Sequence, residues 1–190
     1  MSAVEWVSIG VMLVLAVAWS LSYSAARLDR LHARVEGTLA ALDAQLVRRA
    51  EATLELANSG TLDAASAMML AGAASESLEA AAYDDTHEPG LAFTRERAAV
   101  ESDLTEALDL ALTGETVAQV RSCGQNAYEA LERVRASGQR VQLARRFHND
   151  AVTAVRRVRR LYLVTLFRLA GHAAMPRTVE FADELPTALR

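Results

Sequence analysis

The residues of this chain whose types could support catalysis or metal binding are four histidines, one cysteine and a short acidic cluster. A di-metal site inside a helical bundle needs glutamates together with Glu-x-x-His pairs that face inward. No histidine here has a glutamate three residues before it, and no HExxH motif occurs. The four are His32, His87, His148 and His172. We therefore expect no bound metal and no cofactor, and keep a metal-binding bundle only as an alternative.

The acidic cluster lies in the stretch YDDTHEPG, from Tyr83 to Gly90, and comprises Asp84, Asp85, His87 and Glu88. Its Pro-Gly ending predicts a solvated turn, not a ligand set. Cys123 has no CxxC partner, so we expect a bystander thiol in a reducing compartment. Neither a nucleophile–base pair nor a Gly-rich phosphate loop is recognisable, so the sequence predicts a protein that is not an enzyme.

Composition favours helices throughout. Of the 190 residues 38 are alanine, whereas glycine and proline together number 12. Alanine is the best helix former and the helix breakers are scarce, so an all-α fold is predicted. All 20 basic residues are arginine. The segment from Glu51 to Thr116, however, contains 14 acidic residues and only two arginines. This acidic segment can neutralise the arginines of the last helix, and aromatic residues are few, so we expect no nucleic acid partner.

The longest apolar stretch runs from Trp6 to Ala26 and contains no charged residue. As a helix its 21 residues span about 31 Å, which matches the roughly 30 Å hydrocarbon core of a bilayer. Trp6 near one end, and Trp19 and Tyr23 towards the other, suit the two interfaces. The stretch is too long for a signal peptide and lacks a basic leader, which favours a retained single-span anchor.

Charge next to the span predicts its orientation. Only Glu5 and the amino terminus precede it, whereas Arg27, Arg30 and Arg34 follow within eight residues. Arginine collects on cytoplasmic flanks, so the chain after the span should face the cytoplasm, with the anchor in the inner (plasma) membrane. The alternative is an envelope assembly subunit of the opposite topology.

Helical periodicity continues after the span. A leucine-rich stripe from Leu28 to Leu46 predicts that the first helix leaves the membrane unbroken and ends near Asn58. Further helices are expected at 63–82, 94–112 and from about 115 to 162, the last with a kink at Gly124. The predicted fold is all-α, an N-terminal transmembrane helix followed by an antiparallel four-helix bundle. Residues 1–26 form the anchor, 27–175 the bundle and 176–190 an irregular tail with Phe181 packed on the bundle.

Four helices bring the end of the last one back towards the bilayer. This end carries four arginines and then the apolar run from Leu161 to Phe167. The arginines are Arg156, Arg157, Arg159 and Arg160. They are candidates for contact with an anionic membrane surface, and the apolar run either lies in the interface or caps the bundle core. His148, on the apolar stripe of the same helix, is expected to be a core histidine hydrogen-bonded to a neighbouring helix.

Two stretches resemble signatures of the LemA family of bacterial membrane proteins. Val35 to Arg49, VEGTLAALDAQLVRR, is similar to that family's helix leaving the membrane and ends in the arginine pair Arg48 and Arg49. Ala144 to Val152, ARRFHNDAV, is similar to the signature of its last long helix. Its signature positions are Arg145, His148 and Asn149. The tail pattern, Pro176 followed by Glu180-Phe181, also fits.

The family's usual Ile-Pro-Asn-Leu segment is replaced here by Thr53 to Leu56, and its usual glutamate on the last helix by Gly138, so the chain resembles a divergent member. The resemblance implies one span, a short external amino terminus and a cytoplasmic helical bundle, and it implies no catalytic residues. Family members are often encoded near membrane proteases. From the residues and the resemblance together we expect a membrane-tethered scaffold or adaptor, with a membrane protease or scaffold protein, or a second copy in a homo-oligomer, as candidate partners.

Overall fold

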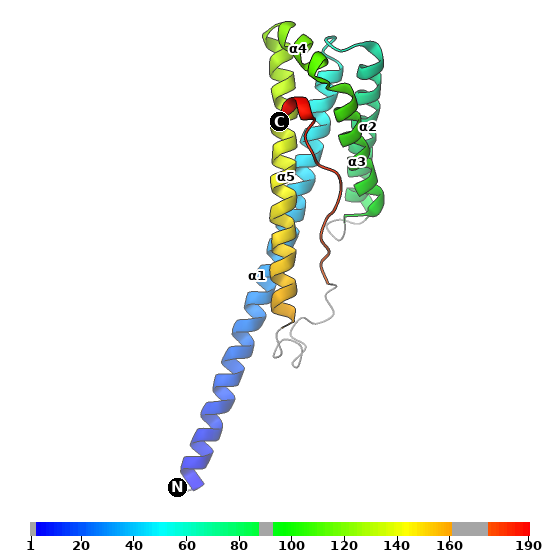
Figure 1. Ribbon diagram of the computed structural model, residues 1–190. Helices are drawn as coiled ribbons and strands as arrows, with labels where there is room; N and C mark the ends of the chain where they lie inside the picture. Colours follow the sequence, from blue (N-terminus) through cyan, green and yellow to red (C-terminus); the bar gives the residue numbers. More distant parts are fainter. Residues whose placement is uncertain (1–2, 88–92, 161–174) are drawn as a thin grey trace. The chain divides into compact units, whose positions relative to one another are not determined.

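The computed structural model describes residues 3–87, 93–160 and 175–190. The described residues form five α-helices and a short 3-10 helix, with no strand among them (Figure 1). The helices are α1 (Ala3–Ala57), α2 (Ala64–His87), α3 (Arg95–Ala111), α4 (Gly114–Ser122) and α5 (Gln125–Arg159), followed by η1 (Thr187–Leu189). The all-α prediction is confirmed.

Local sequence signals explain where most helices begin and end. Asp63 caps α2, because its Oδ1 accepts hydrogen bonds from the backbone N–H groups of Ala65 and Ser66, both at 3.0 Å. Hydrogen bonds from Ser66, first from its side chain and then from its backbone N–H, lower the pKa of Asp63. Thr94 caps α3 through a bond from the Arg97 N–H at 3.0 Å. The helix starts predicted at 63 and 94 therefore follow from capping chemistry.

Two of the expected element boundaries were wrong. The last long helix is not kinked but interrupted, because Gly124 has a φ of +104°, a left-handed conformation that ends α4 before α5 starts. The bundle accordingly has one more helix than the four expected. Tyr83 to His87 belong to α2 and not to a loop; 88–90 lie outside the described residues. The alanine-rich run before Tyr83 keeps the helix going, since alanine favours helix more than a short polar stretch opposes it.

The chain divides into two compact units. The N-terminal unit comprises Met1–Val35 and Asp150–Arg177, and the bundle unit comprises Glu36–Asn149 and Thr178–Arg190. Within the bundle unit, the later part of α1 lies beside the first part of α5, and α2 pairs with α3 (Figure 1). The short connections make neighbouring helices antiparallel, as expected.

The core follows the predicted apolar stripes closely on α1 and α5. Leu42 and Leu46 of α1 pack with Val141 of α5 in the bundle unit. Leu28 packs with Val158 in the N-terminal unit, where Val35 packs with the neighbouring turn of α5. The α2 stripe was predicted less well: Met68 is 77% exposed, because Leu70, Ala74, Ser77 and Ala81 form the buried face instead.

Candidate functional site

A buried arginine on α1 starts the main polar network of the bundle unit. Arg49 is only 2% exposed, and its guanidinium donates to Glu101 Oε2 at 2.7 Å and to Thr105 Oγ1 at 3.0 Å. It also donates to the backbone carbonyl of Glu101 at 2.9 Å. Both partners belong to α3, so one α1 side chain fixes the position of α3 along α1.

Glu101 connects this arginine to a second one. Its other carboxylate oxygen, Oε1, forms an ion pair with Arg97 at 2.9 Å and accepts a hydrogen bond from the Ser77 hydroxyl at 2.7 Å. Arg97 in turn donates to the backbone carbonyl of Ser77 at 2.8 Å and approaches Asp43 of α1 at 3.6 Å. Three helices therefore meet at a single carboxylate that is fully buried.

The energetics of this network favour specificity over raw stability. Taking charges out of water is costly, and good geometry roughly balances that cost, whereas losing one partner strands a buried charge. Burial is the main cause that lowers the pKa of Arg49, opposed by the Glu101 charge and hydrogen bond. The network therefore selects one helix register, since a shift by one turn of α3 would separate the charges.

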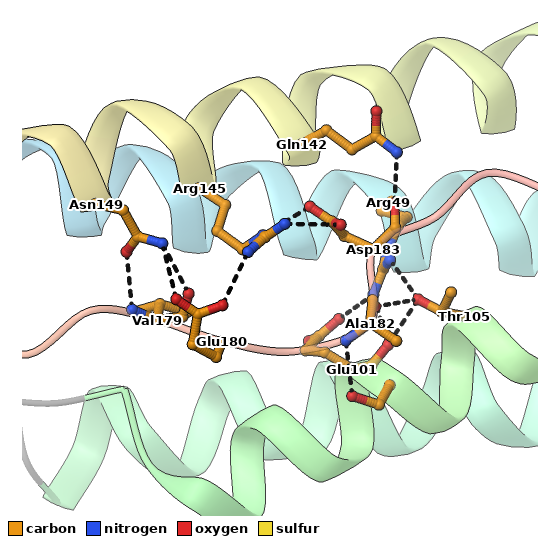
Figure 2. A network of polar contacts seen from close by, with 11 residues as sticks. Arg49, Glu101, Thr105, Gln142, Arg145, Asn149, Val179, Glu180, Ala182 and Asp183 are labelled. Atoms are coloured by element: carbon orange, nitrogen blue, oxygen red, sulfur yellow. Dashed lines mark hydrogen bonds and ion pairs between the residues drawn. The ribbon is translucent and has the colours of Figure 1, made fainter.

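A second set of contacts holds the C-terminal segment Thr178–Arg190, hereafter the strap, in the bundle unit (Figure 2). Asn149 of α5 bonds both backbone groups of Val179: its Nδ2 donates to the carbonyl at 3.1 Å, and its Oδ1 accepts from the N–H at 2.9 Å. Gln142 donates to the backbone carbonyl of Asp183 at 2.7 Å. Side chains of α5 thus take the place of a neighbouring strand for this extended segment.

Arg145 lies between these two amides and binds the acidic side chains of the strap. It donates to both carboxylate oxygens of Asp183, at 2.7 and 3.0 Å, and to Glu180 at 3.3 Å. The hydrogen bond to Asp183 is the main cause that raises the pKa of Arg145. Its guanidinium also lies 5.7 Å from the ring centroid of Phe181, which stacks on Phe93 at 5.5 Å. The two bonds to Asp183 are bidentate, which fixes the orientation of the carboxylate as well as its distance.

The strap also contacts α3, on the side opposite α5 (Figure 2). The Thr105 hydroxyl, which receives a bond from Arg49, donates to the carbonyl of Ala182 at 2.7 Å, and Ala182 N–H donates to Ser102 Oγ at 3.1 Å. Thr105 thereby joins the buried arginine network to the strap. The strap packs on the bundle, with Phe181 part of the contact, and is irregular up to η1.

A groove of about 490 Å³ opens between α1 and α5 on the surface of the bundle unit. Arg133 of α5 reaches across it to Glu55 of α1 with two bonds, at 2.9 and 2.7 Å. Charged side chains of both signs form the walls of the groove, and the residues at its floor have small side chains. The lining side chains include Arg48, Glu51, Ala52, Glu129, Ala136 and Arg140.

The five residues singled out by the family resemblance have different environments. Arg49, Arg145 and Asn149 lie in the two polar networks. His148 is 2% exposed, with its Nδ1 3.3 Å from Thr38 Oγ1 of α1, as expected for a core histidine bonded to another helix. Arg48 instead lines the surface groove.

Sequence reasoning missed the acidic partners. Arg97 and Glu101, four residues apart, occupy the apolar stripe of α3 that continues with Leu104 and Leu108. This interruption of the apolar stripe by two charged residues was the available signal. Asp183 was missed because an irregular tail carries no periodicity from which burial can be inferred.

Trp6, Trp19 and Tyr23 are 63%, 80% and 60% exposed on α1, which is long and apolar enough to cross a membrane. Arg27 and Arg30 follow on the same helix and are exposed. Among the described side chains, no group of three or more histidine, cysteine, aspartate or glutamate residues is placed to hold a metal. His172 and Leu161 to Phe167 lie outside the described residues.

Comparisons of the chain with models of protein families, with curated proteins and with solved structures find no match. The LemA resemblance therefore stays a prediction from the two sequence stretches.

Proposed function

We propose that this protein is a membrane-anchored, non-enzymatic helical scaffold or adaptor whose bundle faces the cytoplasm. The observation that carries the proposal is the single helix α1. Its first part exposes large apolar side chains, and its later part supplies the core residues Leu42, Leu46 and Leu56. Large exposed apolar patches on a protein mark a membrane or a partner, and this one has the length of a bilayer span.

The orientation rests on the arginines that follow the span. Arg27 and Arg30 come directly after the apolar stretch and are exposed. Translocating arginine is unfavourable, which supports a cytoplasmic bundle and an inner-membrane location.

The two polar networks support a scaffold more than a catalyst. Each network contains an ion pair between side chains of different elements, Arg49 with Glu101 and Arg145 with Asp183. The first pair fixes the helix register and the second holds the strap. We include divergent membership of the LemA family in the proposal, because three signature positions, Arg49, Arg145 and Asn149, have these structural tasks.

The groove between α1 and α5 is the surface we assign to a protein partner, such as a membrane protease or another scaffold protein. It presents charges of both signs, from Arg48 and Arg140 to Glu51 and Glu129, and such a pattern selects partners by charge complementarity.

Thiol labelling tests the orientation with the native residue Cys123, which is exposed. An impermeant maleimide is added to intact and to lysed cells, with Cys123→Ser as the control for background labelling. Labelling only after lysis is the expected result. Labelling of intact cells would contradict the cytoplasmic bundle and favour an envelope assembly subunit of the opposite topology.

Crosslinking from the groove then tests the adaptor role. A photoreactive residue at Glu51 should capture a membrane partner, and the same residue at Asp103, exposed on α3, serves as the matched control. Equal capture from both positions would argue against the groove. Stoichiometric metal in the purified protein would favour the metal-binding alternative.

A further inference from the structure

The two compact units of the chain carry opposite charge. The N-terminal unit contains nine arginines and three acidic residues, a formal charge of +6, whereas the bundle unit contains eleven arginines and 21 acidic residues, a formal charge of −10. The unit that holds the apolar span is therefore the basic one. After the span, its only acidic residues are Asp29 and Asp150, so the arginines of this part of the unit outnumber its carboxylates.

Helix packing gathers these arginines from two distant parts of the sequence. Leu28 of α1 packs against Val158 of α5, and Val35 packs against Val152 and Val155. The two helices are antiparallel here, so the turns just after the span lie level with the end of α5. The exposed arginines on these turns are Arg27, Arg30, Arg34, Arg157 and Arg160.

The position of this group relative to the span indicates its ligand. Arg27 directly follows the last residue of the apolar stretch, so a bilayer that accommodates the span places its headgroups at this level. Guanidinium groups bind phosphate through paired N–H donors, and such pairs are stronger than neutral hydrogen bonds. A nucleic acid would have to approach a surface that adjoins the bilayer, which disfavours it.

We propose that the arginines at the membrane end of α1 and α5 form one binding site for the phosphate headgroups of anionic phospholipids. The site deepens the proposed function and rests on its membrane anchor. It also gives the charge division a physical role: the basic unit is attracted to an anionic leaflet and the acidic bundle unit is repelled from it. Each arginine near such a surface strengthens binding about fivefold, which corresponds to about 1 kcal/mol.

The native tryptophans provide a direct test. The chain has two, and Trp6→Phe leaves Trp19 as the only one, about 12 Å along the helix from Arg27. The full-length Trp6→Phe protein is reconstituted in equimolar mixtures of phosphatidylcholine and phosphatidylglycerol in which only one of the two lipids is brominated. The ratio of Trp19 quenching by the two lipids gives the preference for the anionic headgroup.

We expect phosphatidylglycerol to quench more strongly, and the double change Arg157→Gln with Arg160→Gln to reduce the preference by up to about 25-fold. The matched control is Arg133→Gln with Arg140→Gln, which changes the same residue types on the same helix within the bundle unit and should leave the preference unchanged. Circular dichroism of both double variants checks that the helices are retained.

Each other outcome has a definite meaning. Equal quenching by both lipids, or an unchanged preference in the Arg157→Gln, Arg160→Gln protein, overturns the lipid site and leaves the anchor standing. No quenching by either lipid overturns the anchor and the site together. Loss of the preference in inorganic phosphate, but not in chloride of the same ionic strength, would show a site for free phosphate and overturn the lipid assignment.

Discussion

Replacing Asp183 with alanine should loosen the strap from the bundle. Asp183 is 8% exposed and accepts two charge-assisted bonds from Arg145, at 2.7 and 3.0 Å. Losing a partner from a fully buried ion pair costs about 3–5 kcal/mol. Here the Arg145 side chain is 21% exposed and keeps Glu180 at 3.3 Å, so we expect about 2–3 kcal/mol.

The assay is thermal unfolding of the full-length protein in detergent, followed by circular dichroism. For a chain of this length 1 kcal/mol shifts Tm by about 2–4 °C, so Asp183→Ala should lower Tm by about 4–12 °C. Amide exchange should also quicken in the strap before it quickens in α1 and α5, because local opening precedes global unfolding.

The neighbouring Glu184 provides the control. Its pair with Arg190, at 3.4 Å, is 81% and 57% exposed, and exposed pairs contribute about 0.2–1 kcal/mol at most. A double-mutant cycle between Arg145→Ala and Asp183→Ala isolates the pair itself. If Asp183→Ala and Glu184→Ala lower Tm equally, or if the cycle shows no coupling, the strap is not held by this ion pair.

Three further outcomes follow from other contacts. Glu101→Gln should lower the free energy of unfolding, measured by chemical denaturation, by about 3 kcal/mol, because it leaves two buried arginines without their carboxylate. Glu106→Gln, exposed on the same helix, should change it by under about 0.5 kcal/mol. Equal effects of the two changes would refute the buried network. Because the pKa of Asp63 is lowered in the folded state, its stabilising contribution is present above its ordinary pKa of 3.8 and is lost as pH falls through the lower folded value. Amide exchange at the start of α2 should therefore quicken in acid, and less so in Asp63→Asn, which keeps the capping oxygen; identical acid profiles would contradict this. Gly138→Ala should stabilise the protein by about 1 kcal/mol through helix propensity, but only in a Leu185→Ala background. With Leu185 present, the added Cβ would lie 2.6 Å from Leu185 Cδ2. An equal gain in both backgrounds, measured by thermal unfolding, would show that the contact is absent.

The elements with strong periodicity were predictable from the sequence. The stripe from Leu28 to Leu46 gave the buried face of α1, and Asp63 and Thr94 marked helix starts by cap chemistry that acts locally. Glycine inside a helical pattern weakens the helix, so the sequence predicts a kink at Gly124, and only the backbone shows whether the helix bends or ends there.

The polar networks were less accessible to such reasoning. Glu101 is buried because Arg49, 52 residues earlier, reaches it from another helix, and no local rule detects a partner at that distance. The same holds for Asp183 and Arg145, 38 residues apart. In both cases the family resemblance singles out the arginine, whereas the carboxylate that binds it can be identified only from the tertiary fold.

The strap links two helices that lie on opposite sides of it. Arg145, Gln142 and Asn149 of α5 hold it on one side, and Thr105 and Ser102 of α3 hold it on the other. The strap therefore acts as a tie between α3 and α5, and its opening would leave polar groups of both helices without the partners that it supplies.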